Sequence, residues 1–202
     1  MSRRVLRSLA LLPLALVVLA GCGGRNPAAI SHPDAPPPHT GGVRITGNPL
    51  APGFTLHDDR GRTVRLSDFR GRWVAVAFLY THCPDVCPLI AQNLNAALRE
   101  ASDLRVVAVS VDPKGDTPAA VRAFARSHRL TSNFHYLIGS RARLRPVWRD
   151  WHVATVPGPS NTVSHTSFEV LVDPKGRERL FYDAQVRAAD VLHDLRRLRG
   201  TV

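Results

Sequence analysis

Cys83 and Cys87 are the residues whose type and spacing most clearly suggest chemistry in this sequence. Three residues separate them, and a proline follows each cysteine. At this spacing both sulfurs can face the same side of a helical turn. A disulfide across three residues closes a very small loop and would constrain the unfolded chain little. We therefore expect a redox-active or metal-binding pair rather than a structural disulfide.

The surrounding segments should place this pair at one edge of a sheet. Residues 73–80 (WVAVAFLY) form a continuous apolar run of strand length, typical of a strand buried on both faces. Apolar residues at helical spacing follow the pair, from Leu89 to Leu98. Ligands of α/β proteins bind beyond the carboxyl ends of the strands, and a helix N-terminus lowers the pKa of a nearby thiol. This junction is therefore suited to thiolate chemistry.

The ligand types limit which metal such a pair would bind. Two soft thiolates suit copper(I), and an added imidazole makes a three-ligand site. Zinc could use the same ligands, but a structural zinc site takes four. Met1 is the only methionine and lies in a segment that we expect to be removed, so copper in the mature chain must use thiolate, imidazole or oxygen.

The third cysteine, Cys22, follows an apparent export signal. Residues 1–21 have a positively charged start, followed by an apolar run that is shorter than a transmembrane helix normally requires. This is the layout of a secretory signal peptide. The last residues, Leu19-Ala20-Gly21-Cys22, resemble a lipobox, the cleavage site of bacterial lipoproteins. That resemblance implies that Cys22 is lipidated and becomes the N-terminus. Several acyl chains would anchor the protein firmly to a membrane.

The remainder divides into a tether and one domain. Residues 22–47 are rich in Gly, Pro and Ala and cannot bury a core, so we expect a flexible tether. The chain has 202 residues, 44% of them hydrophobic, which suffices for one globular domain over residues 48–202.

The pattern of this domain predicts an α/β fold. Thr117 and Pro118 mark a helix start, as cap and first helical residue, and Thr155–Ser164 is expected to be loop. The alternation of elements indicates a mainly parallel central sheet with antiparallel strands added at its end. We expect a thioredoxin-like fold, with a central mixed sheet flanked by helices and an N-terminal β-hairpin extension. The expected elements are a hairpin (54–66), strand (73–80), helix (89–98), strand (104–111), helix (118–128), strand (134–138), helix (141–151), hairpin (168–182) and helix (188–198).

Three segments resemble one known family. The stretch Tyr80-Thr-His-Cys-Pro-Asp-Val-Cys-Pro88 closely resembles the cysteine motif of the SCO/SenC family, named for synthesis of cytochrome c oxidase. Val111-Asp112-Pro113, followed by Asp116-Thr117-Pro118, resembles a second family segment, and Ser164-His165-Thr166-Ser167 a third. The similarity covers roughly residues 45–200.

The resemblance implies a copper-binding, membrane-tethered protein. The ligands of copper(I) or copper(II) would be Cys83, Cys87 and His165, with Asp85 tuning the charge of the site. The protein would help to build the copper centre of cytochrome c oxidase, by delivering copper, by reducing its cysteines, or both. Its partner would be the copper-bearing subunit of the oxidase. We expect a bacterial monomer on the outer face of the cell membrane, with the lipidated Cys22 replacing the transmembrane helix of many relatives.

A second hypothesis makes the protein an enzyme. Cys83 and Cys87 could form a reversible disulfide and act as a thiol–disulfide oxidoreductase without any metal. His165 separates the two hypotheses, since a metal site uses it and an exchange protein has no need of it. A peroxidase is disfavoured because the spacing of Thr81 does not match the peroxiredoxin motif.

The other polar residues have simpler interpretations. His82 adjoins Cys83, but its side chain need not face the same way, and the family resemblance favours His165. Asp112 and Asp116 are expected to be turn and cap residues. The three tryptophans are expected in the core, and the remaining histidines of the domain on the surface or in ordinary packing: His57, His128, His135, His152 and His193.

The net charge of +11 does not indicate nucleic-acid binding. The basic residues are scattered, with no arginine-rich stripe interleaved with aromatic residues. We interpret them as a solvated surface near anionic lipid.

Overall fold

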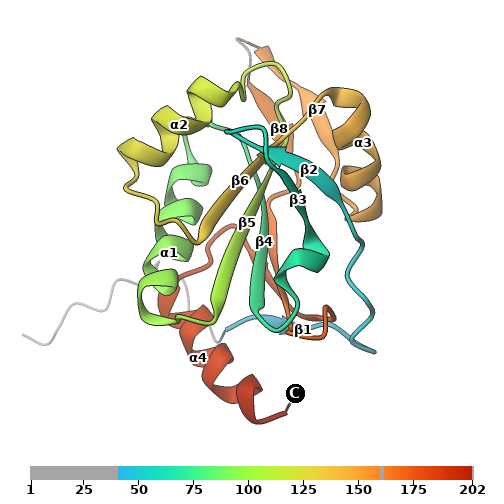
Figure 1. Cartoon of the computed structure of the whole chain (residues 1–202), viewed down its shortest axis with the longest axis vertical. Helices are drawn as coiled ribbons and strands as arrows, with labels where there is room; N and C mark the ends of the chain where they lie inside the picture. Colours follow the sequence, from blue (N-terminus) through green and yellow to red (C-terminus); the bar gives the residue numbers. More distant parts are fainter. Residues whose placement is uncertain (1–40, 160–161, 202) are drawn as a thin grey trace, which may run out of the picture. The chain divides into compact units, whose positions relative to one another are not determined.

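The structure is a computed structural model that describes residues 41–159 and 162–201 (Figure 1). The predicted signal peptide, Cys22 and the tether up to residue 40 lie outside these residues. Within the described ranges, no helix combines the length and the apolar character needed to cross a membrane.

Ten strands and four α-helices, with two short 3₁₀ helices, are described. In chain order they are β1 (Val43–Arg44), β2 (Thr55–Asp58), β3 (Thr63–Arg65), η1 (Leu66–Phe69), β4 (Trp73–Leu79), α1 (Val86–Glu100), β5 (Leu104–Ser110), α2 (Pro118–Ser127), β6 (Phe134–Ile138), α3 (Arg141–Asp150), β7 (Thr155–Pro157), β8 (Val163–His165), β9 (Phe168–Val172), β10 (Glu178–Asp183), α4 (Ala188–Leu198) and η3 (Arg199–Thr201).

The main sheet has the strand order β1-β10-β9-β4-β5-β6-β2-β3. The predicted α/β class, with a central mixed sheet and an N-terminal hairpin (β2–β3), is confirmed. The expectation of a mainly parallel sheet is wrong. Only the pairs β4–β5 and β5–β6 are parallel, while the other five pairs are antiparallel. The physical reason is that hairpins extend the parallel centre on both sides, β2–β3 next to β6 and β9–β10 next to β4.

The first strand lies inside the predicted tether. Val43 pairs with Phe181 of β10, and the backbone N–H of Gly42 donates to a carboxylate oxygen of Asp194 at 2.8 Å. Residues 42–44 of the predicted tether therefore contact the domain, where the edge of β10 pairs with this short strand.

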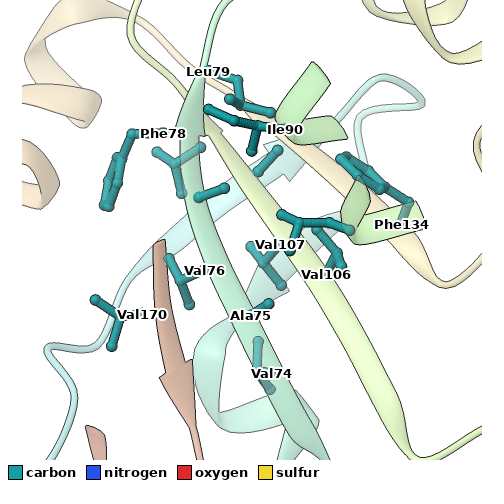
Figure 2. Packing of buried hydrophobic residues seen from close by; sticks show 14 of the residues in the cluster. Val74, Ala75, Val76, Phe78, Leu79, Ile90, Val106, Val107, Phe134 and Val170 are labelled. Carbon is teal, nitrogen blue, oxygen red and sulfur yellow. The ribbon is translucent and has the colours of Figure 1, made fainter. Parts of the chain in front are cut away.

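The core is built on β4, all of whose side chains are buried. Successive side chains of a strand face opposite sides of the sheet. Leu79 lies beside Ile90 of α1, as Figure 2 shows, whereas the ring of Phe78 packs against Trp151, which follows α3, with centroids 5.8 Å apart. Fully burying a side chain of this size contributes about 1.5–3 kcal/mol. This packing fixes the carboxyl end of β4, where the cysteine motif begins.

Candidate functional site

The cysteine motif connects β4 to α1, as predicted. The backbone N–H of Cys83 donates to the carbonyl of Tyr80 at 3.3 Å, which folds the segment into a tight turn after the strand. Cys87 lies in the first turn of α1 and is fully buried, while Cys83 is partly exposed. Both cysteines are free thiols. Apolar packing of α1 thus holds Cys87 against the sheet and leaves Cys83 accessible.

The sulfur of Cys83 takes the place of a helix cap. The backbone N–H of Cys87 donates to this sulfur at 3.5 Å, whereas the side chain of the N-cap residue, Asp85, accepts no capping hydrogen bond. The unpaired N–H groups at the start of a helix favour negative charge. Negative charge on Cys83 is therefore stabilised by the helix that carries Cys87.

The two thiols have opposite pKa shifts. A hydrogen bond from the Cys87 thiol is the main cause that lowers the pKa of Cys83 to about 5, against the opposing effect of partial burial. The same hydrogen bond, together with burial, raises the pKa of Cys87. The pair therefore holds one thiolate, on the accessible Cys83, and one proton, on the buried Cys87.

His165 lies on a small hairpin of its own. The segment Thr155–Ser164, expected to be loop, instead contains β7 and part of β8, which pair Thr155 with His165 in a separate two-stranded sheet. The Nδ1 atom of His165 lies 3.0 Å from the carbonyl oxygen of Thr166. An N–H group on Nδ1 would donate to this carbonyl and leave Nε2 as the free nitrogen.

The environment of His165 favours its neutral form. Burial is the main cause that lowers the pKa of His165, while the Thr166 carbonyl and the nearby Cys83 act in the opposite direction. Its ring stands edge-on to that of Tyr80, with centroids 6.0 Å apart. Neutral imidazole is the form that binds metals.

The structure brings the predicted ligands to the same end of the sheet without assembling a metal cage. Cys83 and Cys87 are in contact, and His165 is close enough to Cys83 for its imidazole to be affected by the thiolate. Among the residues that the structure describes, no group of three or more His, Cys, Asp and Glu side chains is placed to hold a metal ion. The three-ligand set therefore stays a prediction.

The alternative residues take other roles. His82 is exposed, and its Nδ1 lies 3.0 Å from the hydroxyl of Thr81. The three tryptophans are buried, as expected: Trp73, Trp148 and Trp151. The remaining histidines are exposed or contact residues elsewhere: His152 and His193 are exposed, His57 contacts Arg143, His128 contacts Phe124, and His135 contacts Phe69.

Asp116 was predicted to be a turn or cap residue, but its carboxylate is the centre of a hydrogen-bond network. Thr117 is the helix cap, as expected, while the carboxylate of Asp116 is buried next to the cysteine loop. One oxygen accepts from the backbone N–H and the hydroxyl of Thr81, at 2.8 and 2.7 Å. The other accepts from Ser110 at 2.6 Å and Tyr136 at 3.1 Å. Asp116 thus connects the loop before Cys83 to the end of β5 and the middle of β6.

Comparison with known proteins gives one family. The family model SCO1/SenC matches residues 44–200 of this chain. The chain is 31% identical over 159 residues to the mitochondrial SCO2 homolog of Bos taurus, a match that covers 71% of this chain and 58% of that protein. The chain therefore spans less than two thirds of the length of this relative.

Two solved structures share the fold. Arabidopsis thaliana ScoI with copper bound has a TM-score of 0.66 and 27% identity, over 75% of this chain and 99% of that chain. BsSco is described as a member of the Sco family of cytochrome c oxidase assembly proteins with a disulfide switch. Its TM-score is 0.64 at 25% identity, over 77% of this chain and 96% of that chain. These similarities confirm the thioredoxin-like fold.

Proposed function

This chain belongs to the SCO1/SenC family, and from that premise we propose that it carries copper on Cys83, Cys87 and His165 and assists assembly of the copper centre of a respiratory cytochrome c oxidase. The recipient would be the copper-bearing subunit of the oxidase. Copper is cargo here, taken up and handed on at the carboxyl end of β4.

The contact between Cys83 and Cys87, in which the backbone N–H of Cys87 donates to the Cys83 sulfur at 3.5 Å, is the observation that carries this proposal. Cys83 offers a partly exposed thiolate, and Cys87 can add a second soft ligand once it loses its proton. Paired thiolates with an imidazole form a donor set that suits copper. His165 would supply that imidazole. When its Nδ1–H donates to the carbonyl of Thr166, its Nε2 atom is the nitrogen that is free to bind copper.

Copper titration of single variants tests the ligand set. Cys83→Ser and Cys87→Ser should each abolish tight copper(I) binding, because one thiolate cannot replace two soft ligands. His165→Ala should weaken copper(II) more than copper(I), since two thiolates alone can hold copper(I) while copper(II) prefers added nitrogen ligands. His82→Ala is the matched control and should bind like the wild type. If His82→Ala lost copper(II) and His165→Ala did not, the assignment of the histidine ligand would be wrong.

The pKa difference within the pair favours a second candidate function. A thiolate on the accessible Cys83 beside a protonated Cys87 is the arrangement of a thiol–disulfide oxidoreductase. Such a protein would reduce the cysteines of the oxidase copper site without carrying metal. His165→Ala separates the two functions in cells, because it should impair oxidase assembly only if copper delivery matters. Unimpaired assembly would favour the reductase.

The N-terminal sequence supports a lipid anchor. We infer that Cys22 is lipidated and holds the monomer on the outer face of a bacterial cell membrane, based on Leu19-Ala20-Gly21-Cys22. Cys22→Ser should release the protein from the membrane without changing copper binding. Membrane fractionation with sizing of the product is the measurement. An unprocessed, membrane-bound Cys22→Ser protein would instead indicate an ordinary uncleaved anchor.

A further inference from the structure

The two cysteines are held in place by different parts of the fold. Cys87 is fully buried in the first turn of α1, so the packing of this helix fixes its position. Cys83 lies in residues 80–85, the cysteine loop, which belongs to no helix or strand. The distance between the two sulfurs therefore depends on the contacts that hold this loop.

Asp116 holds the cysteine loop at Thr81. One carboxylate oxygen of Asp116 accepts hydrogen bonds from the backbone N–H of Thr81 at 2.8 Å and from its hydroxyl at 2.7 Å. Both the main chain and the side chain of Thr81 are thus fixed, two residues before Cys83. The contact joins the cysteine loop to the segment between β5 and α2.

Asp116 is itself fixed to the main sheet. Its carboxylate is buried, and its second oxygen accepts hydrogen bonds from the hydroxyls of Ser110 at 2.6 Å and Tyr136 at 3.1 Å. Ser110 ends β5, Tyr136 lies in β6, and both are buried. A buried carboxylate whose two oxygens both have donors is held in one place by its hydrogen-bond network. Asp116 therefore connects the cysteine loop to two strands of the main sheet.

The same two segments approach closely at a second point. A Cβ atom on Gly115 would overlap the carboxylate of Asp112 and would lie 3.2 Å from the Nδ1 atom of His82. The absence of a side chain at Gly115 therefore allows the segment before α2 to pack against the cysteine loop. This contact is independent of the hydrogen bonds of Asp116 and supports the same arrangement.

We propose that Asp116 is a positioning residue of the copper site: through Thr81 it holds Cys83 at a defined distance from Cys87 before copper binds. This inference rests on the proposed function for its copper part. A site whose ligands are already in place loses less conformational freedom when the metal binds. Loss of a residue that supports a metal ligand typically lowers metal affinity by about 10–100-fold.

Thr81→Val tests this inference, because valine has nearly the shape of threonine and lacks the hydroxyl. Copper(I) affinity, measured by competition with a chelator, should fall about tenfold. The loss should lie at the lower end of the range because the backbone N–H of residue 81 still donates to Asp116. Thr81→Ser restores the hydroxyl and should restore most of the affinity. His82→Ala removes the other partner of this hydroxyl and should bind copper like the wild type.

Hydrogen exchange in the reduced, metal-free protein tests the position of the loop without copper. The backbone N–H of Cys83 donates to the carbonyl of Tyr80 at 3.3 Å, within the cysteine loop. In Thr81→Val the loop should open more often, so exchange at Cys83 should accelerate about tenfold, as expected for the loss of one hydrogen bond to a carboxylate.

Two buried tyrosines provide a matched pair of variants. Tyr136→Phe removes a donor from Asp116 and should lower copper(I) affinity in the same direction as Thr81→Val, by a smaller factor. Tyr182→Phe removes a donor from Asp194 of α4, at 3.0 Å. It should leave both the copper(I) affinity and the exchange at Cys83 unchanged.

The two measurements separate this inference from the proposed function. Wild-type exchange at Cys83 in Thr81→Val would overturn the inference. Faster exchange without a loss of copper(I) affinity would overturn it as well, because the position of the loop would then not matter to the site. A wild-type protein that binds no copper would reject the proposed function, and exchange at Cys83 would still show whether Asp116 positions the loop.

Discussion

Glu169 is a carboxyl group buried in the middle of the sheet. It lies on β9 between Ala77 of β4 and Tyr182 of β10 and is 1% exposed. Its Oε2 atom has no hydrogen-bond partner among the residues that the structure describes. Burial is the main cause that raises the pKa of Glu169 well above its ordinary value, and Asp183 adds to the shift. The group is therefore protonated in the fold where an exposed glutamate would be ionised.

This residue should make the folded state less stable as the pH rises. In the unfolded chain Glu169 has an ordinary pKa of 4.5. Below that pH the group is protonated in both the folded and the unfolded state, so it does not lower the stability of the fold. Above it, the unfolded chain releases the proton and the folded chain retains it, which favours unfolding until the pH passes the folded-state pKa. The free energy of unfolding should fall by up to about 1.4 kcal/mol per pH unit in this window.

Denaturant unfolding across this pH range measures the effect. Glu169→Gln keeps the size and polarity of the side chain but cannot ionise, so its stability should lack this component of the slope. Glu100→Gln, at the exposed end of α1, is the control and should keep the wild-type slope. Equal slopes in the wild type and Glu169→Gln would show that Glu169 does not titrate differently in the two states.

The candidate ligands could be predicted from sequence, while their supporting residues could not. Two cysteines at a strand–helix junction have a distinctive spacing, and the family resemblance adds His165. Asp116 resembled a cap because it precedes Thr117, and only the fold brings Ser110 and Tyr136 to its carboxylate. The one available signal was that Ser110 and Tyr136 are polar side chains on two mainly apolar strands, and such side chains must find hydrogen-bond partners when buried.

At the level of elements, continuous apolar runs were predicted well and short antiparallel pairs poorly. β4 and β5 are buried on both faces, so each is a nearly continuous apolar run that can be recognised in the sequence. β7 and β8 have three residues each and a partly polar surface, which gives no periodicity to detect. The hairpin nevertheless determines where His165 lies relative to the cysteines. The element that carries the proposed histidine ligand is therefore the one with the weakest sequence pattern.

At the level of the whole molecule, the N-terminal segment joins the domain at a defined place. Asp194 of α4 accepts hydrogen bonds from the backbone of Gly42 at 2.8 Å and from Tyr182 at 3.0 Å. Gly41 has a positive φ of 91°, and a Cβ atom there would lie 2.7 Å from the Asp194 carboxylate. If Cys22 is lipidated, the 19 residue steps from Cys22 to Gly41 reach at most about 65 Å. These contacts therefore fix where the tether leaves the domain.

Gly41→Ala should detach the first strand from the sheet. Gly47 is the matched control, because it also has a positive φ, of 78°, but has no atom near its missing Cβ. Both alanine variants should lose about 1–2 kcal/mol through the left-handed backbone. Only Gly41→Ala should also displace Asp194, breaking its hydrogen bond to Gly42 and exposing the amides of β1. Hydrogen exchange at Val43 and Arg44 should accelerate in Gly41→Ala and not in Gly47→Ala. Equal exchange in the two variants would mean that β1 is held by its pairing with β10 alone, because the backbone strain is common to both and only the contact with Asp194 differs.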